Sequence, residues 1–286
     1  MDSLLRSTII ELEVNISINT PNYSIHESLQ SLYDYILPVE KLANPNLENL
    51  HRLNRLDLRF AFTKLVLWRQ TQFRKIVYID ADVVALRAPD ELFSLPATFA
   101  VAPDIGWPDC FNSGVMLLTP NMSDYWALQT LASSGTSFDG ADQGLLNQYF
   151  ANGKRETISF TYNCTPSAGY QYEPAYRHFG SGISLVHFIG REKPWGTGRA
   201  GMENGGQRVY TELLGRWWAV YERHYRISVG VYCQIHELVL TPCSSLADRV
   251  KADCELFSGT SKASIRGLLE MMQYQGIHRW SARRNP

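Results

Sequence analysis

Two aspartates separated by one residue, Asp80 and Asp82, form the most informative pair of side chains in the sequence. They follow the apolar stretch 75–79, which is typical of a buried β-strand. Polar residues at the C-terminal end of a strand stand where open α/β sheets bind ligands. If the chain turns at Ala81, both carboxylates can reach one hard divalent cation, which commonly bridges protein carboxylates to substrate phosphates. The alternative for such a pair is a solvated turn.

A histidine on a later apolar stretch could complete the same site. His187 lies within 184–189, which also predicts a strand. Manganese accepts mixed nitrogen and oxygen ligands more readily than magnesium does, so an imidazole beside two carboxylates favours Mn²⁺. Lys193 follows on the chain and carries the charge that would neutralise a diphosphate. The alternatives are a core histidine and a surface lysine.

Two further polar segments could surround an electrophilic carbon. A glycine-rich turn that leads into a helix brings Asp139, Asp142 and Gln143 together, and one carboxylate could stabilise or attack such a carbon. Helix capping by either aspartate is the alternative. Asn112 and Ser113 stand just before a predicted strand, although by themselves they indicate only a turn.

Alternating strands and helices are expected to position these residues. The apolar runs 75–80, 98–103, 114–118 and 184–189 are typical of buried strands, and we expect the first three to be parallel. Helical spacing of apolar residues predicts helices over 58–70, 123–133, 142–150 and 207–225, with an amphipathic helix near 265–272. The sequence therefore predicts an α/β fold.

Composition narrows the class of protein. The chain has 286 residues, 45% of them hydrophobic and 19% charged, which fits one large or two small globular domains. A net charge of −1 gives no electrostatic case for nucleic-acid binding. No apolar run reaches the length of about 18 residues that a membrane span needs, so no membrane association is expected. The five scattered cysteines predict reduced thiols and a cytoplasmic protein.

Taken in order, several segments resemble the glycogenin branch of glycosyltransferase family 8. The resemblance extends from about Thr20 to about Tyr225, and the helix around Trp217 is similar to that of a fungal member. It implies a GT-A-like, Rossmann-type domain over residues 1–228 with a mostly helical C-terminal extension over 229–286. The segments are Phe62–Leu65, Tyr78–Asp82, Ala102–Val115, Phe138–Gly144, Val186–Gly190 and Lys193–Trp195.

The resemblance implies a retaining transferase that uses UDP-glucose and Mn²⁺. Asp80, Asp82 and His187 would hold the metal, and catalysis would involve Asp142, Tyr170 and Lys193. Retention through a covalent carboxylate intermediate and retention through same-face attack both remain open. The donor and its sugar would be bound by Arg55, Lys64, Asn112, Ser113, Asp139, Gln143 and Gly190.

Glycogenins also glucosylate their own tyrosine, and Tyr170 falls at the acceptor position. Gly169 and Pro166 predict a loop over 163–174, which could present the phenol to a site. Tyr172 is the second candidate acceptor, and ordinary half-buried aromatics are the alternative. The implied partners are UDP-glucose, the growing α-glucan, a second copy of the chain and glycogen synthase.

The resemblance begins one strand later than the family does. We therefore expect an N-terminally truncated domain in which the missing strand leaves neighbouring strand edges exposed. The alternating segment 9–18 predicts an edge strand. Two hypotheses follow: a glucosyltransferase that primes glycogen, and a catalytically silent protein that pairs with an intact subunit.

Overall fold

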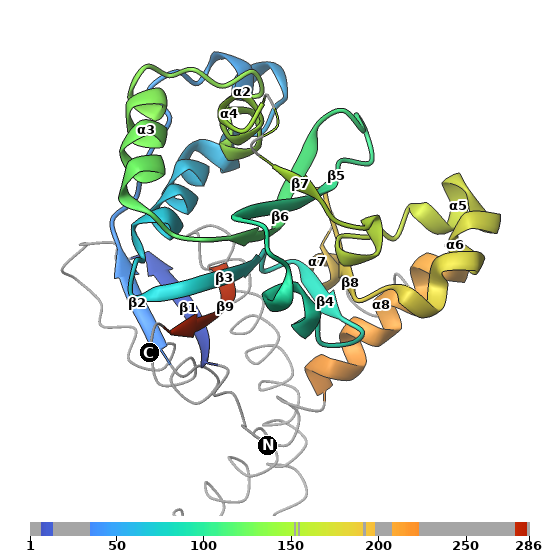
Figure 1. Cartoon of the computed structure of the whole chain (residues 1–286). Coiled ribbons are helices and arrows are strands. Elements are labelled where there is room, and N and C mark those ends of the chain that lie inside the picture. Colours follow the sequence, from blue (N-terminus) through green and yellow to red (C-terminus); the bar gives the residue numbers. More distant parts are fainter. Residues whose placement is uncertain are drawn as a thin grey trace, which may run out of the picture. The chain divides into compact units, whose positions relative to one another are not determined.

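The computed structural model describes residues 7–13, 35–151, 153, 155–190, 193–197, 208–222 and 278–284 (Figure 1). The chain divides into two compact units, and each is built from separate stretches of sequence. The first unit comprises 1–165, 181–187 and 271–286, and the second comprises 166–180 and 188–270. Strands and helices alternate along the first unit, which confirms the α/β class.

A seven-stranded mixed sheet forms the centre of the first unit, with the order β2-β1-β9-β3-β6-β5-β7. Two short strands, β4 and β8, form a separate antiparallel pair. The strands are β1 (Ser7–Glu13), β2 (Tyr35–Val39), β3 (Phe73–Ile79), β4 (Val83–Ala85), β5 (Phe99–Pro103), β6 (Phe111–Leu118), β7 (Glu156–Thr157), β8 (Leu185–His187) and β9 (His278–Arg284).

The helices predicted over 58–70, 123–133, 142–150 and 207–225 are confirmed, the first of them with 3₁₀ geometry. None of the described helices has the length and apolar run that crossing a bilayer requires. The first unit contains α2 (Glu48–Arg52), η1 (Leu56–Arg69), η2 (Asp90–Ser94), α3 (Met122–Ser133), α4 (Asp142–Tyr149) and η3 (Phe160–Tyr162). The second contains α5 (Ala168–Gln171), α6 (Glu173–Phe179), α7 (Pro194–Thr197) and α8 (Arg208–Tyr221). The short η4 (Gly180–Gly182) spans a boundary between the two units in the sequence.

The expected parallel direction of the three central apolar strands is wrong. Strand β6 pairs antiparallel with both β3 and β5. The short connection 104–110 between β5 and β6 makes a hairpin, which imposes the antiparallel direction. The apolar runs 76–79, 99–103 and 114–118 within these strands are largely buried because both faces of the sheet are covered, and this requirement is the same for either direction.

Side chains alternate between the two covered faces of β3 and β6. On one face, Ile76 and Met116 join a core with η1, α3 and α4. On the other, Val77 and Leu117 pack with Leu92 of η2. All four strand residues are at most 1% exposed. Strand alternation thus converts a continuous apolar sequence into two cores.

The segment expected to form an edge strand lies inside the sheet. Strand β1 pairs with β2 on one side and with β9 on the other. Strand β9 also pairs with β3, so the edge of β3 is covered instead of exposed. Alternating polarity cannot distinguish an edge from an interior strand when the partner comes from the opposite end of the chain.

The second unit contains a cluster of aromatic rings and a correction to the expected loop. Trp217 of α8 packs near Trp195, with ring centroids 5.9 Å apart. Residues 168–171 form helix α5 instead of a loop, and Gly169 lies so close to Val209 that a Cβ there would overlap it. This contact with α8 gives the short α5 the packing that its length alone does not provide. The helix predicted near 265–272 lies outside the described residues.

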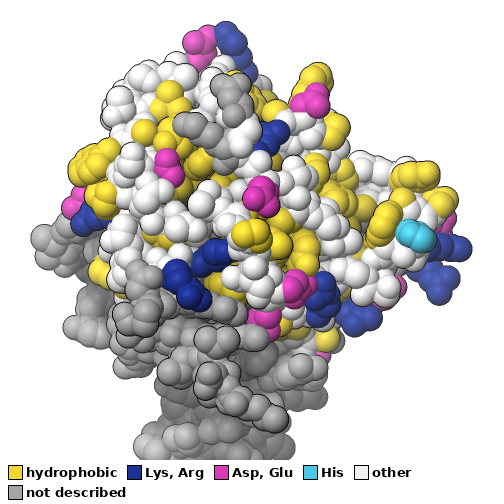
Figure 2. Space-filling model, viewed as in Figure 1, with side chains coloured by type: hydrophobic (Ala, Val, Ile, Leu, Met, Phe, Trp, Pro, Cys, Tyr) yellow, Lys and Arg dark blue, Asp and Glu magenta, His cyan; other side chains and the backbone are white. Residues whose placement is uncertain are grey.

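Figure 2 shows basic and acidic side chains of the described residues interspersed with uncharged ones on the face in view. The mixture agrees with the near-zero net charge of the sequence.

Candidate functional site

A tight turn between two strands positions the paired aspartates. Asp80 follows β3 and Asp82 precedes β4, and the N–H of Val83 donates to the carbonyl of Asp80 at 3.3 Å. The N–H of Asp80 donates to the carbonyl of Gly114 at 2.8 Å, which anchors the turn to β6. In the β4–β8 pair, Val83 stands opposite His187. The histidine therefore arrives beside Asp82 through strand pairing.

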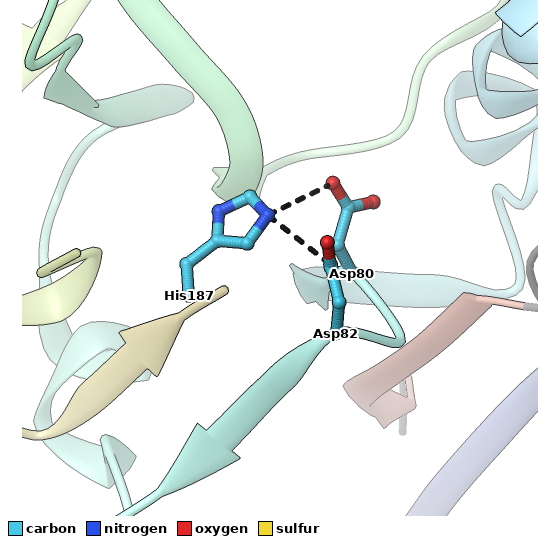
Figure 3. Close-up of side chains that lie close together, drawn as sticks. All are labelled: Asp80, Asp82 and His187. Carbon is cyan, nitrogen blue, oxygen red and sulfur yellow. Dashed lines mark ion pairs between the residues drawn. The ribbon is translucent and has the colours of Figure 1, made fainter. Parts of the chain in front are cut away.

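Asp80, Asp82 and His187 converge (Figure 3). His187 Nε2 lies 3.1 Å from Asp82 Oδ1 and 3.8 Å from Asp80 Oδ2. One ligand atom from each residue lies within 4.8 Å of the other two. Asp82 and His187 are 8% and 4% exposed, so the alternative of a solvated turn does not fit this largely buried group. Two carboxylate oxygens and one imidazole nitrogen are a suitable donor set for a divalent cation such as Mn²⁺.

A buried lysine joins this group to a third aspartate. Lys64 Nζ lies 2.7 Å from Asp142 Oδ2 and 3.3 Å from Asp80 Oδ1, and it donates to the carbonyl of Ser113 at 3.2 Å. Lys64 also lies over the ring of Tyr78, whose hydroxyl donates to Asp80. Burial acts to lower the pKa of Lys64, but the charges of Asp142 and then Asp80 outweigh it. The net pKa is raised, and the ammonium stays charged.

Asp142 and Asp139 have different surroundings although they are three residues apart. Asp142 Oδ2 accepts from Ser113 Oγ at 2.7 Å as well as from Lys64. Asp139 Oδ1 accepts from the N–H groups of Ala141 and Gly144 at the start of α4. Burial raises the pKa of Asp139, helped by the charge of Asp142 and opposed by the Ala141 N–H. The capping interpretation therefore fits the contacts of Asp139, whereas Asp142 is bonded to the site.

Amide side chains extend the network along β6 and α4. Asn112 Nδ2 donates to Gln143 Oε1 at 3.0 Å and to Asp104 Oδ2 at 3.2 Å. Gln143 Nε2 donates to the same Asp104 oxygen at 3.1 Å. Asn112 and Ser113 lie inside β6 and are buried. The strand therefore begins before the predicted run 114–118 and includes these two residues, which the sequence had placed in a preceding turn.

The remaining candidate residues lie in other surroundings. Arg55 forms an ion pair with Asp57 at 3.0 Å. In the second unit, Lys193 is buried and donates to the carbonyl of Phe188 at 2.8 Å, so it is not the surface lysine considered above. Gly190 has φ of 105°, a conformation that favours glycine. Tyr170 lies in α5, and its side chain is outside the described part of the structure.

Sequence reasoning assigned no role to three residues that contact the site: Tyr78, Asp104 and Asn163. Asn163 Oδ1 lies 2.9 Å from His187 Nδ1. Asp104 directly follows β5, so the rule that located Asp80 after β3 also identifies it. For Asn163 no local signal exists, because its side-chain contacts, to Asn112 and His187, are to residues distant in the sequence.

Residues 4–198 match the family described as Glycosyl transferase family 8, which is an earlier start than the expected Thr20. A curated protein named Glycogenin from Neurospora crassa is 59% identical over 224 residues, covering 78% of this chain and 32% of that protein. Glycogenin-1 of Mus musculus is 38% identical over 209 residues, covering 69% of this chain and 62% of that protein.

The chain thus spans less than two thirds of the length of these relatives. Among solved structures, the glycosyltransferase GlyE of Streptococcus pneumoniae aligns over 71% of this chain and 55% of its own, with 16% identity and a TM-score of 0.44. The family match alone covers more than half of the sequence. The chain belongs to glycosyl transferase family 8.

Proposed function

We propose that the chain is a retaining glucosyltransferase that uses UDP-glucose and glucosylates its own tyrosine, as a glycogenin-like primer of glycogen. The observation that carries the proposal concerns Asp80. This residue lies with Asp82 and His187 in the group that could hold a cation, named the metal group here. It also forms an ion pair with Lys64, which is in turn paired with Asp142. Transfer from a nucleotide sugar needs positive charge at the diphosphate and a carboxylate at the sugar carbon. Asp80 connects the residues proposed for these two roles, because it is part of the metal group and contacts Lys64, the partner of Asp142.

Mn²⁺ is the proposed cation, held by Asp80, Asp82 and His187. When bound, it would supply positive charge to the departing diphosphate. Lys64 fixes Asp142, whose carboxylate would face the anomeric carbon and stabilise the positive charge that develops there. Asn112, Ser113, Asp139 and Gln143 are proposed to surround the glucose, and Arg55, Lys64, Lys193 and Gly190 are proposed to contact the rest of the donor.

In the proposed reaction, the bond between the anomeric carbon and the diphosphate oxygen breaks, and a bond to the phenolic oxygen of Tyr170 forms. A free phenol has a pKa of about 10, so its proton must leave during the attack. A carboxylate or the departing diphosphate oxygen can take that proton. Tyr172, which is 68% exposed, is the second acceptor candidate, and the growing α-glucan accepts later glucose units. A second copy of the chain, glycogen synthase and a cytoplasmic location complete the proposal.

The test is incubation of the purified chain with UDP-glucose and Mn²⁺, followed by peptide mass spectrometry. We expect hexose on the peptide that contains Tyr170, and none at that position in Tyr170→Phe. Asp82→Ala should lower donor turnover by roughly 10³-fold or more, since several kcal/mol of charge stabilisation are lost. Glu48→Gln, at an exposed acid in α2, is the control.

Three results would change the proposal. Hexose that disappears only in Tyr172→Phe would move the acceptor to Tyr172. Donor hydrolysis without any hexose on the chain would indicate another acceptor. No donor turnover by the folded wild-type chain would favour the silent subunit that pairs with an active one.

A further inference from the structure

His187 has a partner on the side of its ring that faces away from the carboxylates. Its Nδ1 lies 2.9 Å from Oδ1 of Asn163, a side chain that is 2% exposed. Backbone pairing holds the two residues together: Cys164 forms a bridge with Val186, and the N–H of His187 donates to the carbonyl of Cys164 at 2.8 Å. Asn163 is therefore held beside the imidazole by the backbone contacts of the residue that follows it, Cys164.

The hydrogen-bond network determines which way each amide points. A carboxylate accepts hydrogen bonds at neutral pH, so the oxygen of Asp104 that lies 3.2 Å from Asn112 must face its Nδ2. Asn112 Oδ1 then accepts from Asn163 Nδ2 at 2.8 Å. The backbone N–H of Gly114 donates to the same Asn112 oxygen at 2.9 Å, which fixes this orientation independently.

With its Nδ2 committed to Asn112, Asn163 presents its Oδ1 to the histidine. An amide oxygen only accepts, so Nδ1 of His187 must carry the proton that is donated. The other ring nitrogen, Nε2, lies 3.1 Å from Asp82 Oδ1 and is the atom directed at the metal group. The order of donors from Asp104 to His187 thus places a proton on Nδ1 of the imidazole.

We infer that Asn163 is a positioning residue that accepts the Nδ1–H of His187 and keeps the lone pair of Nε2 available to a cation between Asp80 and Asp82. The inference rests on the proposed metal site. Partners of this kind orient the ligand and fix its tautomer, and their loss commonly weakens metal binding by about 10–100-fold. Asn163 acts through His187 and makes no contact with the cation itself.

Mn²⁺ titration followed by electron paramagnetic resonance tests this on the folded full chain. Asn163→Ala should weaken Mn²⁺ binding by about 10–100-fold. Asn163→Asp keeps an oxygen beside Nδ1 but sets its second oxygen against Asn112 Oδ1, so it should be less stable than wild type and still bind Mn²⁺ more tightly than Asn163→Ala does. Asn147→Ala is the matched control, since Asn147 is also a buried amide but is bonded to Phe111 at the start of β6. Wild-type affinity in folded Asn163→Ala would overturn the inference, and so would an Asn163→Asp affinity as weak as the loss expected for Ala.

A second measurement does not depend on the metal. Imidazole ¹⁵N spectra of the metal-free chain at about pH 8.5, above the usual pKa of histidine, report which nitrogen is protonated. The His187 signals are assigned by their absence in His187→Gln. We expect Nδ1 to be protonated in wild type, and a wild-type ring protonated at Nε2 alone would refute the inference. If wild type binds no Mn²⁺ but shows the expected tautomer, the metal proposal fails while the positioning by Asn163 stands.

Discussion

At the residue scale, the position of His187 depends on the absence of a side chain at Gly114. A Cβ at Gly114 would overlap the imidazole of His187 and lie 2.9 Å from Asn112 Oδ1. Because Gly114 lies within a buried strand, the backbone cannot move away cheaply. We expect Gly114→Ala to displace the imidazole and weaken Mn²⁺ binding by at least tenfold, a loss of about 1.4 kcal/mol.

Gly180→Ala serves as the control for that substitution, because nothing lies within 4 Å of the position of its Cβ. Calorimetric titration of Mn²⁺ into both variants checks the prediction. Equal affinities in the two would show that the imidazole does not need the space at Gly114.

The two aspartates that flank the start of α4 give a second comparison at this scale. Asp142→Asn removes the charge paired with Lys64 and should lower turnover by roughly 10²–10⁴-fold, as loss of a positioned charge at a reacting carbon does. Asp139→Asn weakens acceptors for two N–H groups at the start of the helix and should cost about 1 kcal/mol of unfolding free energy.

Steady-state kinetics and urea denaturation of both variants separate these effects. Near-wild-type turnover in Asp142→Asn would reduce Asp142 to a structural partner of Lys64. The buried lysine would then need Asp142 only for its charge balance, and the catalytic assignment would be withdrawn.

At the element scale, β9 is the strand whose position is most informative, because it joins β1 to β3. Ala282 pairs with Ser7 on one side and with Ile76 on the other. Proline there removes one ladder hydrogen bond from an interior strand, which such strands do not tolerate. We expect Ala282→Pro to lower the unfolding free energy by about 2–3 kcal/mol, which is large among single substitutions.

Ala282→Val is the control, because valine favours strands and keeps the N–H. Urea denaturation measures stability, and hydrogen exchange at the Ile76 amide reports on the sheet locally. Unchanged stability in Ala282→Pro would mean that β9 does not hold this place between β1 and β3.

At the scale of the whole molecule, the proposed acceptor and the metal group lie in different compact units. Asp82 belongs to the first unit and Tyr170 to the second. Helix α5, which contains Tyr170, is packed on α8 within its own unit, so the tyrosine is not on a free loop. Because a second copy of the chain is part of the proposed function, we expect transfer between two copies of the chain.

Mixing two inactive variants tests this expectation. Tyr170→Phe retains the metal group, and Asp82→Ala retains the acceptor. The mixture should add hexose to the Asp82→Ala chain, and neither variant should label Tyr170 when incubated alone. A mixture as inactive as its components, together with a wild-type rate per chain that does not change on dilution, would assign the transfer to a single chain.

The sequence by itself determined the features that depend on neighbouring residues. Asp80 and Asp82 share a site because a turn follows a buried strand, and covalent geometry keeps residues two apart close together. The helices at 123–133 and 142–150 follow from apolar spacing over a few turns. The α/β class follows from the order of these elements. The division at residue 228 and the roles assigned to individual site residues remain predictions.

Only the tertiary structure decided the features that depend on distant pairing. Apolar strands covered on both faces look alike whether they run parallel or antiparallel, so the direction of β6 could not be read from its residues. Strand β9 reaches the sheet from the far end of the chain. Asn163 meets His187 because a bridge at Cys164 aligns them, and Lys64 keeps its charge because Asp142 and Asp80 surround it. Buried polar groups need hydrogen-bond partners, and here the partners come from segments that are distant in the sequence. A local sequence pattern therefore cannot predict these contacts.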